Sequence, residues 1–196
     1  MRTPLLIYFM LCSIQHYAQT ADGKHSEFKK LKCGLYQNKA GDIGFKTKAL
    51  ADDQGNFRII YQQHVYLIDK HEPEQQQPVA FREVVDTASF EILNPFYCKD
   101  KTYVYAIHYT SGGAVFNATK RIDPGSFNVF GTSTYGTDGK KVYYRINTMK
   151  MADRASFNSI TGSENGAYDK KNYYLDGEVM SLEDVRAMGF DKKKNQ

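Results

Sequence analysis

The chain has 196 residues, of which 41% are hydrophobic and 24% charged, and its formal net charge is +4. This length suffices for one domain with a sizeable core, and the composition is typical of a globular protein rather than a disordered one. The positive charge is small and spread along the chain. It therefore argues against nucleic-acid binding, which needs a face of clustered Lys and Arg.

Residues 1–20 have the pattern of a secretory signal peptide. Arg2 supplies the positive charge, residues 5–14 (LLIYFMLCSI) form an apolar run, and Ala18 and Thr20 are small residues just before Ala21. The run is too short to span a bilayer. A buried N-terminal strand or helix is the alternative. We expect an exported protein of the periplasm or cell surface, with one domain over residues 21–196 and no membrane span in that mature part.

Two cysteines, Cys33 and Cys98, remain after the predicted cleavage. In an oxidising compartment an even pair indicates a possible disulfide. The bond would close a loop of about 65 residues and stabilise the fold by roughly 3–5 kcal/mol in the loop-entropy account. Two buried free thiols in separate places are the alternative.

The stretch 34–69 is predicted to form two or three β-hairpins and is less regular than the rest of the chain. Turn residues occur at Asn38, at Gly41 and Asp42, and at residues 54–56 (QGN), with strand-like runs between them. The polar stretch 71–78 (HEPEQQQP) contains Pro73 and Pro78 and predicts an exposed connector.

Two short motifs alternate along residues 86–189, which indicates an internal repeat. The first motif has an Asp, then turn residues, then an aromatic-rich strand. Its copies are KDKTYVYA (99–106), TDGKKVYYR (137–145) and YDKKNYYLDG (168–177), in which Asp100, Asp138 and Asp169 each precede by five residues Tyr105, Tyr143 and Tyr174. Each copy predicts a hairpin. Alternation in the first copy predicts Tyr103, Tyr105 and Ile107 on one strand face and Val104 and Ala106 on the other.

The second motif is D-x-x-S-F. Its copies are DTASF, DPGSF and DRASF, which run from Asp86 to Phe90, from Asp123 to Phe127 and from Asp153 to Phe157. The Asp is expected to cap a short helical turn, and the Phe to point into the core. A related frame, SLEDV, begins at Ser181 and predicts a C-terminal helix over residues 182–188 that ends at Gly189.

Together the motifs predict a mainly β protein, built from tandem β-hairpin repeats with short capped helical turns and a short C-terminal helix. One such unit cannot bury its apolar face alone, whereas stacked units can. The first motif is nearly literal in DKKNYY (169–174), and with D-x-x-S-F it resembles the DKNYY family of bacterial proteins. The resemblance covers residues 86–189 well and 34–69 loosely, because Tyr61 takes the Asp position in the first copy. It implies an exported repeat protein with no established activity, so it transfers no catalytic residue.

The sequence carries no recognisable catalytic or metal motif. The histidines lack zinc-ligand spacing, no G-x-S-x-G occurs, and we expect no cofactor. The recurrent tyrosines are the remaining candidates for an interaction surface, since Tyr is enriched at interfaces. They are Tyr103, Tyr105, Tyr143, Tyr144, Tyr173 and Tyr174. The alternative, which we favour, is that their rings pack between neighbouring units.

The two motifs recur, and no unique cluster of polar residues stands beside them. This pattern predicts a non-enzymatic binding module of the bacterial envelope. Its partner would be another protein or a surface glycan, and an immunity protein against a secreted toxin is one version. A hydrolase of envelope polymers, with a site formed only in three dimensions, is an alternative function. A structural component of the envelope is another.

Overall fold

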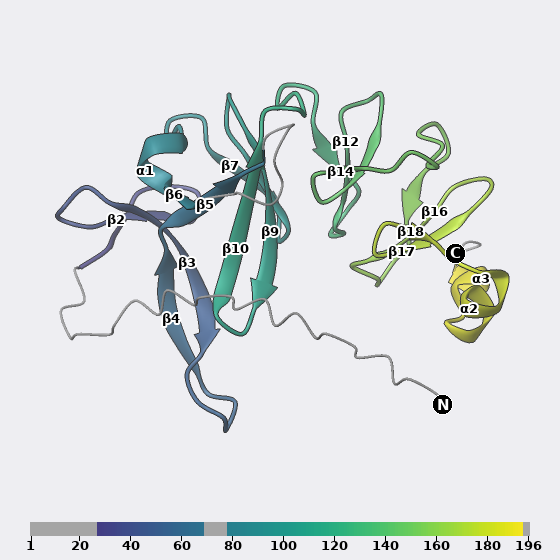
Figure 1. Ribbon diagram of the computed structural model, residues 1–196, viewed down its shortest axis with the longest axis horizontal. Coiled ribbons are helices and arrows are strands. Elements are labelled where there is room, and N and C mark those ends of the chain that lie inside the picture. The colour runs from purple at the N-terminus through teal and green to yellow at the C-terminus, as the bar shows by residue number, and fades with distance from the viewer. Residues whose placement is uncertain (1–26, 69–77, 194–196) are drawn as a thin grey trace, which may run out of the picture.

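The computed structural model describes residues 27–68 and 78–193 (Figure 1). The predicted signal peptide lies outside the described residues, as does the polar connector up to residue 77. The described part is mainly β and forms four sheets, which confirms the predicted fold class. Sheet formation follows from the abundance of Tyr, Phe and β-branched residues in short runs between turns.

The first sheet is a run of three antiparallel hairpins. Its strands, in spatial order, are β1 (Lys29–Lys30), β2 (Leu35–Gln37), β3 (Ile43–Leu50) and β4 (Phe57–Gln62). Two of the hairpins, β2–β3 and β3–β4, lie within residues 34–69, where two or three were predicted. Between β2 and β3 the Asn38 side chain accepts from the backbone N–H of Asp42, at 2.8 Å. Gly41 in this turn has a φ of 85°, a conformation that favours glycine. The β3–β4 hairpin projects away from the rest of the molecule (Figure 1).

The second sheet is the largest, with six strands in the order β6-β5-β10-β9-β8-β7. The strands are β5 (His64–Leu67), β6 (Pro78–Ala80), β7 (Glu91–Asn94), β8 (Tyr97–Lys99), β9 (Val104–Thr110) and β10 (Gly113–Thr119). A one-turn helix, α1 (Phe81–Val84), follows β6. The pairing of β5 with β10 is parallel, whereas the other pairings are antiparallel.

Residues 104–107 of strand β9 are buried on both faces, whereas Tyr109 and Thr110 at its end are exposed. Tyr105 and Ile107 contribute to a core shared with the first sheet, whereas Val104 and Ala106 contribute to the next core along the chain. The predicted alternation is therefore correct, but each face meets a different neighbour. Strand β9 is the wall between two cores.

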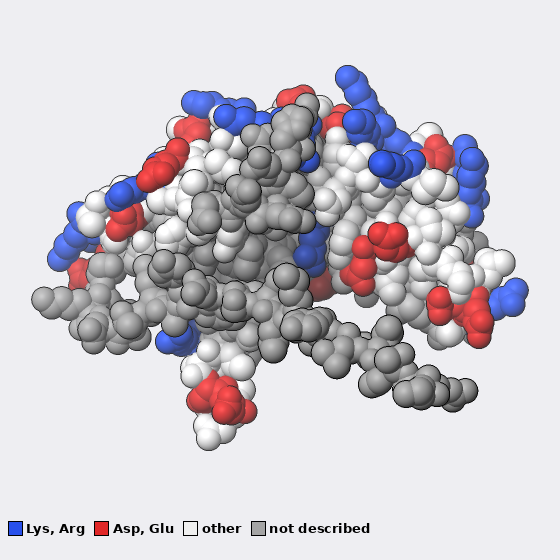
Figure 2. Space-filling view, in the orientation of Figure 1, with Lys and Arg blue, Asp and Glu red and all other residues white. Residues whose placement is uncertain are grey.

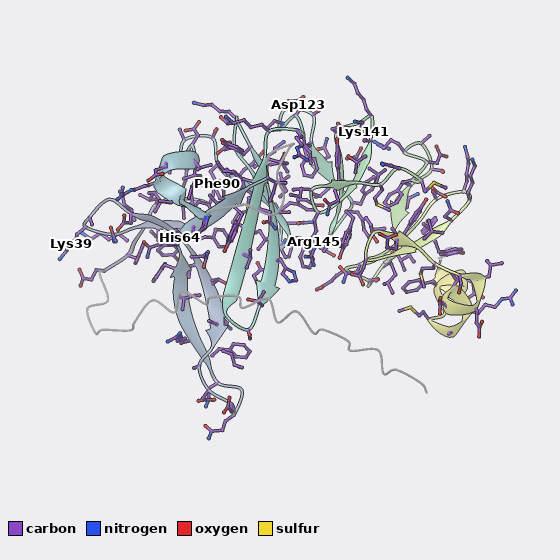
Figure 3. All side chains as sticks on the ribbon, viewed as in Figure 1. Lys39, His64, Phe90, Asp123, Lys141 and Arg145 are labelled. Atoms are coloured by element: carbon purple, nitrogen blue, oxygen red, sulfur yellow. The ribbon has the colours of Figure 1, made fainter. Side chains whose placement is uncertain are left out.

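Two four-stranded sheets of identical topology follow. The third sheet holds β11 (Asn128–Val129), β12 (Tyr135–Thr137), β13 (Val142–Tyr144) and β14 (Asn147–Thr148), and the fourth holds β15 (Asn158–Ser159), β16 (Gly166–Tyr168), β17 (Tyr173–Leu175) and β18 (Glu178–Val179). We call residues 86–119 unit 1, 123–149 unit 2 and 153–180 unit 3. The three units lie in a row (Figure 1). In unit 2, Asp123 and Lys141 lie at one edge of the row and Arg145 lies away from it (Figure 3).

The row ends at two short helices, α2 (Leu182–Ala187) and α3 (Phe190–Lys193). Ser181 caps α2 by accepting from the N–H of Asp184, and Gly189, with a φ of 67°, follows its end, so the predicted helix is confirmed. Val185 and Phe190 are buried against Ile160 of unit 3. These helices cover the apolar end of the last unit, which a repeat array requires.

Candidate binding groove

Each of the three Asp residues of the first motif holds a turn together. Asp169 accepts from the N–H groups of Lys171 and Asn172, both at 2.7 Å, and from the Tyr174 hydroxyl at 2.7 Å. Asp100 binds the N–H groups of residues 102 and 103 and the hydroxyl of Tyr105 in the same way. Asp138 binds the N–H groups of residues 140 and 141 and the hydroxyl of Tyr143. The spacing of five residues between Asp and Tyr is therefore the spacing of a side-chain hydrogen bond across a turn.

The second motif is joined to the first. Asp153 caps its turn by accepting from the Ser156 hydroxyl at 2.7 Å, and its own N–H donates to Asp169 at 2.8 Å. Lys170 pairs with Asp153 at 2.8 Å. Unit 1 repeats this arrangement with Asp86, Ser89, Asp100 and Lys101. In unit 2 the Lys position is Gly139, and Asp123 retains only its turn bonds to Gly125 and Ser126.

The apolar residues of the motifs also form a repeated contact. Phe90, Phe127 and Phe157 are buried, and each ring lies within 6.4 Å of the motif Tyr of its unit, centroid to centroid. Opposite that Tyr on the neighbouring strand lies a small residue, Cys98, Gly136 or Ala167. A Cβ built on Gly136 would come within 2.3 Å of the Phe127 ring. The Phe thus requires a small residue beneath it.

The tyrosines proposed as an interaction surface separate into two groups. Tyr105, Tyr143 and Tyr174 are buried, at 0%, 4% and 1% exposure, and burial raises the pKa of each hydroxyl, that of Tyr174 to about 12. The structure therefore removes these three from an exposed surface, because they pack in the core and bind Asp. Tyr103, Tyr144 and Tyr173 are half-buried. Tyr144 donates to Asp176 of unit 3, at 2.8 Å.

Hydrogen bonds between units fix their spacing. The Tyr97 hydroxyl lies 2.7 Å from the Thr134 carbonyl and 2.9 Å from that of Arg145, which joins unit 1 to unit 2. Tyr135 occupies the same place in unit 2, where its hydroxyl donates to the Asn165 carbonyl and accepts from the N–H of Gly177. A Cβ on Gly177 would lie 2.8 Å from the Tyr144 ring, so that ring packs directly on the unit 3 backbone.

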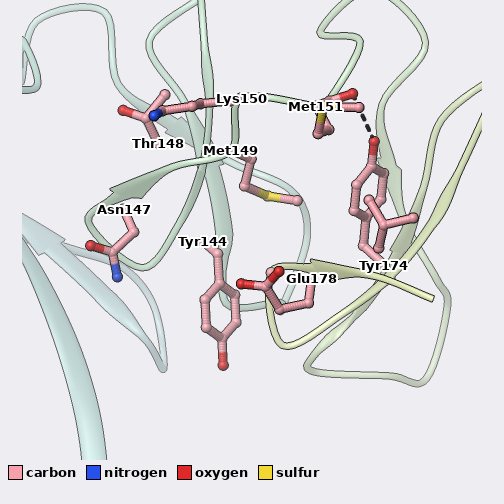
Figure 4. Close-up of a pocket in the computed structure, with 10 residues that line it drawn as sticks. Tyr144, Asn147, Thr148, Met149, Lys150, Met151, Tyr174 and Glu178 are labelled. Carbon is pink, nitrogen blue, oxygen red and sulfur yellow. Dashed lines mark hydrogen bonds between the residues drawn. The ribbon is translucent and has the colours of Figure 1, made fainter.

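A groove with a volume of about 360 Å³ lies between units 2 and 3. Tyr144 and Tyr174 line it together with Met149, Met151 and Val179, as well as Asn147, Thr148, Lys150, Gly177 and Glu178 (Figure 4). Met151 and Val179 are exposed, at 69% and 47%. The sequence indicated two of its residues, Tyr144 and Tyr174, as candidates but missed the groove itself, because most of its other lining residues lie outside the two motifs.

Two edge strands flank the groove. Strand β14 is at the edge of the third sheet and β18 at the edge of the fourth. Met149 donates its N–H to Val142, and Met180 donates to Tyr173, so these residues face their own sheets. Because backbone groups alternate in direction along an antiparallel strand, those of Thr148 and Val179 point outward. Glu178 is the one carboxylate among the lining residues, and Lys150 the one cation.

Both cysteines are free thiols in the structure, so the disulfide stays a prediction. Cys33 is exposed and Cys98 is buried in β8. Burial raises the pKa of the Cys98 thiol strongly, and the charge of nearby Cys33 adds to this rise. Cys98 also occupies the small-residue position that Gly136 and Ala167 hold in the other units.

Alkylation of the native protein is therefore expected to label Cys33 and to leave Cys98 unreacted until denaturant is added. The buried thiol is shielded and carries little thiolate. Mass spectrometry after labelling with and without denaturant measures this. If neither cysteine reacted in denaturant without a reductant, the sequence prediction of a bond would be correct and the free-thiol arrangement wrong.

In the part of the chain that the structure describes, no group of three or more His, Cys, Asp or Glu side chains could hold a metal ion. None of the described helices is long and apolar enough to cross a membrane. No curated protein and no solved structure matches the chain. The model of the DKNYY family matches residues 8–178. That match spans most of the sequence, including both motifs of all three units, and the chain belongs to the DKNYY family.

Proposed function

We propose that this protein is a non-enzymatic binding module, exported to the bacterial envelope, that holds an extended segment of a partner protein in the groove between units 2 and 3. The observation that carries the proposal is the position of two edge strands, β14 and β18, on either side of a groove lined by both apolar and polar residues. An extended peptide binds such an edge by adding a strand to the sheet.

The groove residues suit a peptide ligand. The outward N–H and C=O groups of Thr148 and Val179 supply main-chain hydrogen bonds, which give affinity independent of partner sequence. Met149 and Met151 supply flexible, polarisable side chains that adapt to the side chains of a partner. Lys150 and Glu178 supply one charge of each sign for a polar partner residue.

Two further observations favour a protein partner and a non-enzymatic role. The hydroxyls of Tyr144 and Tyr174 are already bound to Asp176 and Asp169, so neither is free to donate to the hydroxyls of a glycan. Hydrolysis of a glycan commonly uses two carboxylates. Among the residues that line the groove, Glu178 supplies the one carboxylate. Binding of a secreted toxin, as an immunity protein, is one form of this function.

The test is affinity capture of partners by the purified protein from an envelope extract, compared among three variants. We expect Val179→Pro and Met151→Glu each to reduce recovery of the partner at least about tenfold. Proline removes the outward N–H of an edge strand without breaking the β17–β18 ladder. Leu182→Glu is the matched control, because Leu182 is 71% exposed but lies outside the groove. Equal recovery by all three variants, or no specific partner, would overturn the proposal.

A further inference from the structure

The β3–β4 hairpin has one face turned to the core and one turned outward. Paired residues place Thr47 with Ile60 and Ala49 with Arg58 on the core side, where Ile60 packs on Gly113 of β10. Because side chains alternate along a strand, the neighbouring pairs lie on the outer face. They are Lys46 with Tyr61, Lys48 with Ile59, and Leu50 with Phe57.

Three large apolar side chains on this outer face are exposed to solvent. Phe57, Ile59 and Leu50 are exposed by 66%, 51% and 39%. At the base of the hairpin, Phe28 stacks on Tyr61 at a centroid distance of 4.2 Å and covers it. The cover ends there, so Leu50 and its cross-strand partner Phe57 stand in solvent together with Ile59, two residues along β4. Such a contiguous patch on a projecting element is a feature of interaction surfaces.

Charge is distributed unevenly along the same face. Lys46 lies toward the base, Lys48 lies opposite Ile59 in the middle, and Asp52 and Asp53 lie at the tip. Figure 2 shows the acidic tip at the end of the projecting hairpin. Asp52 is committed to the turn, since it accepts from the N–H groups of Gln54 and Asn56 and from the Asn56 amide. Asp53 is exposed.

We infer that this outer face binds the same face of a second copy of the chain, with the two hairpins antiparallel about a two-fold axis. A two-fold interface needs a surface that is complementary to itself. The hairpin meets this condition, because reversing one copy places the acidic tip on Lys46 and the Ile59–Lys48 pair on the Phe57–Leu50 pair, where the aliphatic stem of Lys48 lies on Leu50. A two-fold axis between the Ile59 and Phe57 pairs places Ile59 against Phe57 of the second copy, and Lys46 against its tip.

The two hairpins would pack face to face, like the sheets of a sandwich. Successive outward pairs are about 6.6 Å apart along the hairpin, so the three pairs and the tip match in register when one copy is reversed. The surface lies far along the chain from the groove of units 2 and 3. Dimer formation and partner capture can therefore fail independently of each other.

The test is sedimentation velocity of the purified chain over a concentration series. We expect a dimer that dissociates on dilution, and Ile59→Lys should abolish it. Lys46→Glu and Asp53→Lys should each weaken the dimer about tenfold, because each brings like charges together. The double variant Lys46→Glu with Asp53→Lys should restore the dimer to within about threefold of the original, because opposite charges again face each other.

Circular dichroism melting shows whether each variant is folded, and all three substituted positions are exposed. A monomer at every concentration tested would overturn the inference. So would a dimer that survives Ile59→Lys, since it would use another surface. A double variant as weak as the single variants would overturn the antiparallel register.

Discussion

Asp169→Ala is expected to lower the free energy of unfolding by about 3 kcal/mol and the melting temperature by roughly 10 °C. The carboxylate is 1% exposed and accepts from three backbone N–H groups and the Tyr174 hydroxyl. Alanine removes this acceptor from the three N–H groups, which costs more than the bonds themselves contribute, whereas the Tyr174 hydroxyl keeps the Met151 carbonyl at 3.1 Å. Denaturant unfolding measures the loss.

The same carboxylate predicts loss of stability in acid. Burial alone would raise the pKa of Asp169, but the N–H of Asp153 and the Tyr174 hydroxyl, with the other donors, hold the pKa below its ordinary value of 3.8. A group with a lowered pKa stabilises the folded state fully above its unfolded value, and that contribution is lost as pH falls through the folded value. Unfolding curves should therefore show a decline below about pH 4 that is smaller in Asp169→Ala.

Two comparisons separate this account from a general effect of substitution. Tyr174→Phe removes one donor and leaves the carboxylate bound by backbone, so it should cost only about 1 kcal/mol. Because each unit contacts its neighbours alone, amide exchange in Asp169→Ala should accelerate mainly in residues 153–180. Unchanged stability combined with loss of partner binding would show instead that Asp169 belongs to a binding site.

Phe127→Ala is expected to be the most destabilising of the substitutions considered, at about 4 kcal/mol. The ring is fully buried in the core between units 1 and 2, with its centroid 5.2 Å from that of Tyr97. Removing it leaves a cavity that the hydrogen-bonded turn of Asp123 prevents from collapsing. Thermal and denaturant unfolding both report this loss. Phe127→Leu, which keeps much of the volume, should cost less than half as much.

A double-mutant cycle tests the close packing of Phe127 on Gly136. Alone, Gly136→Ala should destabilise by about 1–3 kcal/mol, because its methyl group would overlap the ring. In the Phe127→Ala background the methyl group has space, and its cost should largely disappear. Additive losses would show that the two positions do not compete for the same volume.

The local features of each unit could be predicted from the sequence, because their physical causes lie within a few residues. Asp-to-Tyr spacing, the D-x-x-S-F turn and the Ser181 cap are formed by contiguous chain, so their composition suffices to indicate turns, hairpins and a helix. The stacked units were also predictable, since one unit cannot bury its own apolar face. The role of Tyr105 as a buried Asp partner was not, because alternation alone does not say which face meets a second core.

The tertiary structure alone decided how the units meet and what they leave exposed. Tyr97 reaches Arg145, 48 residues away, and Tyr144 packs on Gly177 of the next unit. The groove and the outer face of the β3–β4 hairpin likewise depend on which surfaces other elements cover. Hydrogen bonds and packing between distant segments depend on the relative placement of whole sheets. Motif spacing within one unit does not determine that placement. The turn that Asp169 stabilises, in contrast, depends mainly on eleven consecutive residues, YDKKNYYLDGE.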